Sequence, residues 1–474
     1  MNKSSRYKGL IKNFLLLFTG TFVAKVLSFF MVPFYTSILT TEDYGMADLI
    51  TTTVLLLLPF FSLLMDEAVM RFTLDSSLNR KQVFTIAVLL SSIGYIILMC
   101  ISPVVLLFDN LRPFYWFIVL YYIVSWVYNI VVGYVRGLDR LSLTTIAGVI
   151  HTFSYLGMNI LFLAVLKIGI YGYLLAMSLS NLLAILFLII SCKLYKNFVS
   201  IKEIDWTLAK KMVLYSIPMI PNYISWWFCN CSDRYMVSFF CGNSITGIYS
   251  VAYKIPTILS SMTSIFSSAW RISSVEDFGS QESLKFFNRI YKFYSGVLLI
   301  GAAWLIAGTK FLASILYAKD FFVAWKITPF LILAYTISAL ANFVESIFNA
   351  SKQTKTLFIA SMTGGAINII LNYILIPIYS GEGAAIATVI SYAVILLIDM
   401  INTRKILKMN FGLIRVLISY VILTAEIILI LSDSRCGFVG VFLCAILVCV
   451  INIEELLQIA RMLISKVLRK DIKI

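Results

Sequence analysis

The sequence predicts an all-α polytopic membrane protein with about fourteen transmembrane helices. The first observation is composition: 61% of the residues are hydrophobic and 13% are charged, whereas soluble domains are about 45–50% apolar. The second is that apolar runs of about 20 residues, long enough to cross a bilayer as a helix, recur along the whole chain. The third is that the polar connectors are short. We therefore expect no separate soluble domain.

The apolar runs place the expected membrane spans. These spans are 11–39, 43–70, 82–108, 113–135, 142–166, 169–192, 211–240, 245–269, 284–308, 322–348, 356–378, 383–403, 411–431 and 436–453.

Lysine and arginine are distributed unequally between alternate connectors. One set of connectors, together with both ends of the chain, holds 29 of the 38 basic residues, and the other set holds 7. Basic residues accumulate on the cytoplasmic side of membrane proteins, so this bias predicts that both termini are cytoplasmic. The net charge of +15 is thus explained by topology, and we expect no nucleic-acid partner.

Weak internal repeats suggest two related bundles. "TEDYGMADL" (41–49) matches "SITGIYSVA" (244–252), and "GMNILFLAVLKIGIYGYLLA" (157–176) is echoed by 366–387. About 200 residues separate the copies, which predicts parallel repeats with a binding site between them. We expect a six-helix lobe at 1–200, a second at 201–408, and two additional helices with a basic amphipathic tail on the membrane lipids at 409–474.

Enzyme signatures are missing from the sequence. It has no nucleophile elbow and no phosphate-binding glycine loop, and its single histidine, His151, is expected to be a packed residue. The eight cysteines show no metal-ligand spacing. We expect neither an enzyme nor a cofactor or metal.

Lys25 is the most informative charged residue because it lies in the middle of the apolar run 11–39. It is some fourteen residues from either end of that run, or roughly 20 Å at 1.5 Å per residue. A lysine side chain is too short to reach the membrane surface from there. Lys25 either pairs with an acid of a neighbouring helix or faces a water-filled cavity that receives an anion.

Several other charged residues are candidates. Lys254 lies about 10 Å into a span, and Asp233-Arg234 is either a local pair or part of a site close to two helix-bending prolines, Pro218 and Pro221. Arg71 and Arg271 close their spans on the cytoplasmic side, where they either anchor the helix or collect an anionic headgroup.

Two acids and one aromatic segment complete the candidates. Glu345 and Glu426 are candidate ion-coupling carboxylates, with an ordinary buried pair as the alternative in each case. The aromatic segment "NYISWWF" (222–228) is interpreted as part of an interfacial belt, or else as a sugar-stacking surface.

Three segments resemble the Wzx-type polysaccharide flippases, which belong to the MATE/MOP exporter superfamily. They are "NFLLLFTGTFVAKVLSFFMVPFYTSILTTEDYGMADLI", "YSIPMIPNYISWWFCNCSDRYMVSFFCGNSITGIYSVAYKI" and "INIILNYILIPIYSGEGAAIATVIS". The most specific patterns are Pro33 with Tyr44-Gly45, and Asp233-Arg234 followed by Gly247 and Lys254.

The resemblance implies a two-lobed MATE-like bundle in a bacterial inner membrane. It would move an undecaprenyl-diphosphate-linked oligosaccharide to the outer leaflet by alternating access, during O-antigen (lipopolysaccharide) or capsule synthesis. A polysaccharide polymerase and a chain-length regulator are the partners implied. Lysine is a compact partner for phosphate, which suits Lys25 to a diphosphate.

Two alternatives remain. An ion-coupled multidrug or small-molecule antiporter of the same fold should carry an acid in the first lobe, yet no Asp or Glu occurs between residues 13 and 41. A membrane glycosyltransferase or polymerase generally needs a sizeable outward loop, which the short connectors do not offer.

Overall fold

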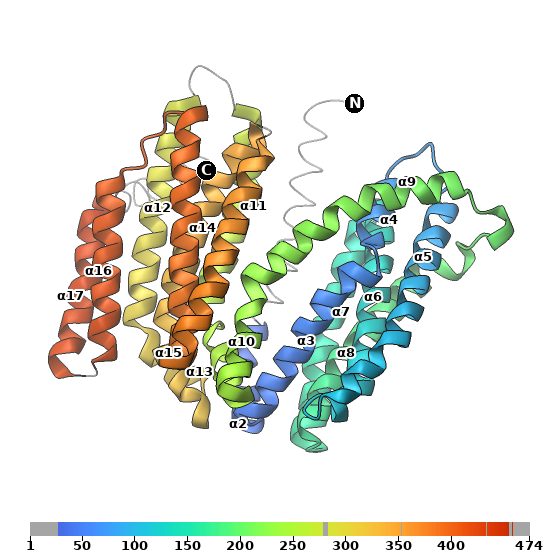
Figure 1. Ribbon diagram of the computed structural model, residues 1–474, viewed down its shortest axis with the longest axis horizontal. Coiled ribbons are helices and arrows are strands. Elements are labelled where there is room, and N and C mark those ends of the chain that lie inside the picture. The colour runs from blue at the N-terminus through green and yellow to red at the C-terminus, as the bar shows by residue number, and fades with distance from the viewer. Residues whose placement is uncertain (1–26, 278–282, 352, 433, 455–456, 458–474) are drawn as a thin grey trace, which may run out of the picture. The chain divides into compact units, whose positions relative to one another are not determined.

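The computed structural model of the chain is helical throughout most of its described part, which comprises residues 27–277, 283–351, 353–432, 434–454 and 457 (Figure 1). Contacts along the chain divide it into two compact units, one ending at Ser232 and the other beginning at Asp233. The boundary between the units falls inside one helix, α10, which runs Ile220–Ala252.

The first unit is a helical bundle. Its helices are α2 (Val32–Ile38), α3 (Thr41–Phe61), α4 (Met65–Thr73), α5 (Arg80–Ile101), α6 (Tyr115–Gly137), α7 (Leu141–Asn159), α8 (Gly169–Cys192), α9 (Trp206–Ser216) and the first part of α10. Apolar residues of α3, α4, α5, α6, α8 and α9 form one continuous core.

The second unit contains the rest of α10 and seven further helices. These are α11 (Pro256–Asp277), α12 (Ser283–Ala307), α13 (Thr309–Leu316), α14 (Thr328–Ala350), α15 (Thr354–Ile406), α16 (Leu413–Leu431) and α17 (Arg435–Ile451). Helix α15 bends back at Ser380, whose φ of 53° is left-handed, so it covers two predicted spans, 356–378 and 383–403.

The structure confirms the all-α membrane architecture. Within the described residues, nine helices are long and apolar enough to cross a membrane. Large apolar side chains such as Ile414, Val421 and Phe438 are exposed by 77%, 68% and 66%, as expected for surfaces that face lipid. Of the first predicted span, 11–39, only the end from residue 27 is described. The predicted amphipathic tail lies outside the described residues except for Glu454 and Leu457.

Polar residues outside the apolar runs set several helix starts. The hydroxyl of Thr40 accepts a hydrogen bond from the Asp43 N–H at the start of α3, and Asn79 accepts one from Lys81 at the start of α5. Asp205 accepts hydrogen bonds from the first turn of α9. Such N-caps satisfy backbone donors that have no partner inside the helix.

The predicted span 43–70 is wrong as a single helix. It breaks after Phe61, because Leu63 and Leu64 both have left-handed backbones with φ of 53° and 50°. The residues after the break form the separate helix α4, whose first turn holds Asp66 and Glu67 and whose last turn holds Arg71. The acids at the start of α4 and the arginine at its end interact favourably with the helix dipole.

Two other predicted spans also differ in detail. The span 211–240 is interrupted by the 3-10 turn Ile217–Met219, which contains Pro218, as expected of a residue that lacks an N–H. The span 322–348 begins only at Thr328, because Lys319–Lys326 forms a 3-10 segment.

Two glycines let α4 lie unusually close to α6. A Cβ atom at Gly133 would come within 2.6 Å of the Asp66 carbonyl oxygen, and one at Gly137 within 2.6 Å of the Thr73 Cβ. The glycines are four residues apart on one side of α6, the spacing that allows close helix contact in membranes. Any side chain at Gly133 would push α4 away.

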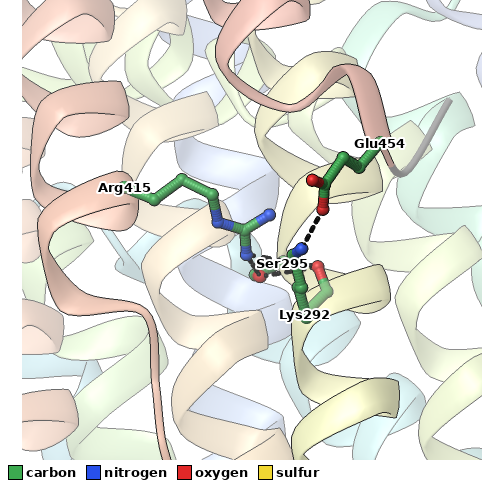
Figure 2. Close-up of polar contacts among 4 residues, drawn as sticks. All are labelled: Lys292, Ser295, Arg415 and Glu454. Atoms are coloured by element: carbon green, nitrogen blue, oxygen red, sulfur yellow. Dashed lines mark hydrogen bonds and ion pairs between the residues drawn. The ribbon is translucent and has the colours of Figure 1, made fainter.

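The last two helices dock on α12 through polar groups (Figure 2). Arg415 of α16 donates from Nη2 to the Ser295 Oγ at 2.5 Å and to the Lys292 carbonyl oxygen at 3.2 Å. The Lys292 ammonium forms an ion pair with Glu454, just beyond α17. The backbone N–H of Asn410 donates to the Asn288 side chain at 2.9 Å. Helices α16 and α17 therefore belong to the second unit.

Candidate functional site

The predicted site residues fall on different elements of the two units. Lys25 lies outside the described residues. Arg71 is in α4, Asp233 and Arg234 are in α10, Lys254 follows α10, Arg271 is in α11, Glu345 is in α14 and Glu426 is in α16.

Asp233 and its neighbours form the best-defined polar cluster among the predicted residues. The Asp233 side chain is 3% exposed. Its Oδ2 atom accepts hydrogen bonds from the Tyr249 hydroxyl at 2.5 Å and the Tyr253 hydroxyl at 2.7 Å. Two hydroxyl donors satisfy a buried carboxylate that would otherwise lose its hydration without compensation.

Arg234 lies beside the same cluster. Its guanidinium is 4.9 Å from the centre of the Tyr253 ring, a cation–π contact. The sequence offered two readings of Asp233-Arg234, a local pair or a site, and the structure adds the tyrosines as partners of both residues. A positively charged group is thereby held beside the buried polar cluster of Asp233 and the two tyrosines.

The two tyrosines were missed by sequence reasoning, which treated most aromatic residues as an interfacial belt. Tyr249 and Tyr253 are four residues apart, and their hydroxyls lie 3.0 Å from each other. The chain breaks at Gly242 with a φ of 86°, which brings them back to Asp233. The sequence shows that the two tyrosines are four residues apart. Apart from Gly242 itself, it gives no signal that the chain turns back toward Asp233 at this point.

Lys254 occupies a break between helices, where the sequence had placed it inside the span 245–269. Residues 253–255 form a turn, the Lys254 N–H donates to the Val251 carbonyl at 2.9 Å, and α11 begins at Pro256. Lys254 is half-buried and follows Tyr253 directly. It therefore lies next in the chain to the Asp233 cluster.

On the first unit, Arg71 is exposed while its acidic neighbours are partly buried. Glu67 accepts a hydrogen bond from the Tyr223 hydroxyl at 2.8 Å. The Trp227 indole N–H donates to the Thr52 carbonyl at 2.8 Å. Two aromatic residues of "NYISWWF" therefore attach the start of α10 to α3 and α4, a role that neither the belt nor the sugar-stacking interpretation included.

His151 packs among aromatic rings, as expected. Its ring stacks on Tyr155 at 6.2 Å between centroids and lies 6.0 Å from the ring of Tyr128. Among the described residues, no group of three His, Cys, Asp or Glu side chains is arranged to hold a metal ion.

The two predicted ion-coupling acids are not brought together with Asp233 by any described hydrogen bond. Glu426 is fully buried in α16, and neither of its carboxylate oxygens has a hydrogen-bond partner among the described residues. Glu345 is partly buried in α14, where a second acid, Asp399 of α15, lies within electrostatic range.

The helices, the short connectors and the apolar spans define a polytopic membrane protein, and several solved structures share its fold. The chain is similar to a lipid II flippase, MurJ, in an inward closed conformation, with a TM-score of 0.70 and 16% identity over 95% of this chain and all of the other. It is also similar to an inward-facing multidrug resistance MATE transporter of the MOP superfamily, with a TM-score of 0.64 and 14% identity over 80% of this chain and 94% of that one.

A MATE transporter of Vibrio cholerae gives a TM-score of 0.55 at 12% identity, covering 85% of this chain and 98% of the other. No protein of curated function matches this chain by sequence. The model of one family, described as polysaccharide biosynthesis protein, matches residues 10–271. The chain belongs to this polysaccharide biosynthesis family and has the fold of MOP-superfamily transporters.

Proposed function

We propose that the protein is a flippase for an undecaprenyl-diphosphate-linked oligosaccharide repeat unit. The observation that carries this proposal is the combination of a polysaccharide biosynthesis family with the fold of a lipid II flippase over 95% of the chain. The repeat unit would move from the cytoplasmic to the outer leaflet of a bacterial inner membrane for O-antigen or capsule synthesis. Both termini would be cytoplasmic, as the basic connectors indicate.

The cargo explains why cations lie inside the membrane region. A diphosphate that enters a site of low dielectric needs positive partners, since an unpaired charge is costly there. We assign this role to Lys25, Arg234 and Lys254, with Arg71 and Arg271 collecting the headgroup on the cytoplasmic side. Asp233 then has an indirect role. It accepts a hydrogen bond from Tyr253 and so orients this ring, and the Arg234 guanidinium lies over the same ring.

Alternating access between two lobes, 1–200 and 201–408, is the proposed transport cycle, with 409–474 as an accessory segment. Glu345 and Glu426 are its candidate ion-coupling groups. A polysaccharide polymerase and a chain-length regulator would receive and use the flipped unit.

Complementation of a flippase-deletion strain tests the proposal. We expect Lys25→Ala to abolish surface polysaccharide at normal protein abundance, and Lys25→Arg to retain partial function because the charge remains. Lys202→Ala, which removes an exposed lysine outside the spans, is the matched control and should be neutral. Full function in Lys25→Ala would contradict the assignment of Lys25.

Reconstituted vesicles distinguish the flippase from the antiporter of the same fold. Wild-type protein should expose a fluorescent undecaprenyl-diphosphate oligosaccharide to a membrane-impermeant quencher, and Arg234→Gln should slow this by about tenfold or more, the equivalent of about 1.4 kcal/mol. The exposed Arg112→Gln should not. Extrusion of organic cations without any movement of the lipid would favour the antiporter.

A further inference from the structure

Asp399 is a buried acid that the proposed cargo site does not use. It lies in the second arm of α15 and is 0% exposed. Neither carboxylate oxygen has a hydrogen-bond partner among the described residues. Asp233 is almost equally buried but accepts two tyrosine hydroxyls. The contrast shows that this unit supplies partners to one buried aspartate and not to the other.

A second unpaired polar group lies beside Asp399. The Thr403 side chain is also 0% exposed, and its hydroxyl has no partner within the described part of the chain. Residues four apart lie on one face of a helix, so the hydroxyl and the carboxylate share a face of α15. Thr336 and Thr388 instead donate to the carbonyl four residues earlier, the usual arrangement for a buried threonine in a helix.

The charged group that acts on Asp399 from a neighbouring helix is another acid. Helix α14 packs along α15, and the negative charge of its Glu345 disfavours a second negative charge on Asp399. The basic residues of this end of α15, Arg404 and Lys405, are exposed. No cation is therefore positioned to neutralise the two carboxyls among the described residues of α14 and α15.

Two neighbouring carboxyl groups cannot both be ionised in a dry interior at an acceptable free energy. A bound proton removes one charge and turns that carboxyl into a hydrogen-bond donor. A metal ion is a poorer fit, because hard cations take about six or more oxygen ligands, and this group offers two carboxyls and one hydroxyl. The described residues also contain no metal-binding group of three acidic, histidine or cysteine side chains.

We propose that Asp399 and Glu345 form a proton-binding site between α14 and α15, with the Thr403 hydroxyl as its polar neighbour. The ligand is a single proton, held on Asp399 while the two helices are packed and released to water when the carboxyl becomes hydrated. This site does not depend on which lipid the protein carries. It differs from the Asp233 cluster because no tyrosine among the described residues donates to Asp399.

Infrared spectroscopy of the full-length protein in lipid nanodiscs tests the proposal directly. Near neutral pH the wild type should show carboxylic-acid C=O absorption, to which the buried Glu426 also contributes, and Asp399→Asn should lose part of this band. Asp320→Asn removes an exposed acid of the same unit and should leave it unchanged. An undiminished band in Asp399→Asn would overturn the assignment.

Thermal unfolding gives a second, independent readout. Asp399→Asn imitates the protonated side chain, so it should fold and have a Tm near that of the wild type at low pH. The wild-type Tm should fall as the pH rises and the proton is lost, whereas the Tm of Asp399→Asn should change less. Glu345→Gln removes the repulsion that favours the proton on Asp399. The Tm of this variant should therefore begin to fall at a lower pH than the Tm of the wild type.

Sodium titration separates a proton site from a cation site. Sodium chloride replaces choline chloride stepwise, so that the ionic strength stays constant. This replacement should leave the wild-type Tm and the infrared band unchanged. A sodium-dependent rise in Tm that disappears in Asp399→Asn would show a metal-ion site and overturn the proton assignment.

Discussion

The Nη2 atom of Arg415 in α16 donates a hydrogen bond to the Ser295 Oγ in α12 at 2.5 Å (Figure 2). Around this contact lie the Lys292–Glu454 ion pair and the hydrogen bond from Asn410 to Asn288. The contacts involve the start of α16 and the end of α17. The final hairpin is therefore attached to α12 near one end, by groups that can be altered singly.

We expect Arg415→Ala to loosen the hairpin and to lower stability by about 1–2 kcal/mol, as is typical for a lost hydrogen bond from a charged, partly exposed group. Hydrogen exchange of α16 and α17 should increase, while that of the first unit should not. Arg404→Ala removes an exposed arginine of α15 and serves as the control. Equal exchange in both variants would contradict a docking role for Arg415.

Acid should weaken the same attachment. The hydrogen bond from Lys292 and its positive charge hold the pKa of Glu454 below the usual range. A lowered pKa in the folded state means that the stabilisation is present above the unfolded pKa of glutamate and is lost as the pH falls through the folded pKa. Hydrogen exchange of α17 should therefore rise on acidification in the wild type.

Glu454→Gln is the matched variant for this pH effect. It should show faster exchange in α17 at neutral pH and a smaller additional rise in acid. The exposed pair should also weaken with added salt, since screening acts strongly on surface charges. An unchanged acid response in Glu454→Gln would assign the effect to another group.

Gly133→Val should separate α4 from α6. The added Cβ would lie 2.6 Å from the Asp66 carbonyl oxygen, and overpacking of this kind costs roughly 1–3 kcal/mol. Gly148→Val in α7 is a control, because a Cβ there meets no atom of the described residues within 4 Å. Thermal unfolding in detergent should show a clear loss for Gly133→Val and a much smaller change for Gly148→Val.

Tyr253→Phe should destabilise the Asp233 cluster. It removes a hydroxyl that donates to Asp233 Oδ2 at 2.7 Å, and a buried carboxylate that loses a donor costs about 1–3 kcal/mol. The exposed Tyr373→Phe should be neutral. A double-mutant cycle of Tyr249→Phe and Tyr253→Phe should show coupling, since both hydroxyls serve one oxygen atom. Additive losses would mean that the tyrosines act independently.

The sequence predicted the helices well where hydropathy decides them. The runs 82–108, 113–135, 142–166 and 169–192 correspond to spans of the structure at Arg80–Leu107, Arg112–Gly137, Leu141–Val165 and Gly169–Cys192. A run of apolar residues must be helical in lipid, because its backbone groups have no other hydrogen-bond partners there. A bend at Pro218 was also expected from the sequence, and the structure has a 3-10 turn at this position.

The breaks at Leu63-Leu64 and Ser380 were not predictable in the same way. Leucine and serine give no local signal for a left-handed backbone, so packing around these positions determines their conformation. The polar clusters were harder still: Asp233 accepts hydrogen bonds from residues 16 and 20 positions later, and Asp399 lies in a helix that packs against α14, which carries Glu345. Composition and charge named the candidate residues, and only the fold shows their partners.

Gly242 separates Asp233 from both of its tyrosine donors. Asp233 Oδ2 therefore joins the two halves of α10 across their bend, alongside a hydrogen bond that the Ser238 Oγ donates to the Asn243 Oδ1 at 2.7 Å. A rotation of one half of α10 about Gly242 would lengthen both tyrosine hydrogen bonds to Asp233 at once. The bend is therefore a restrained hinge.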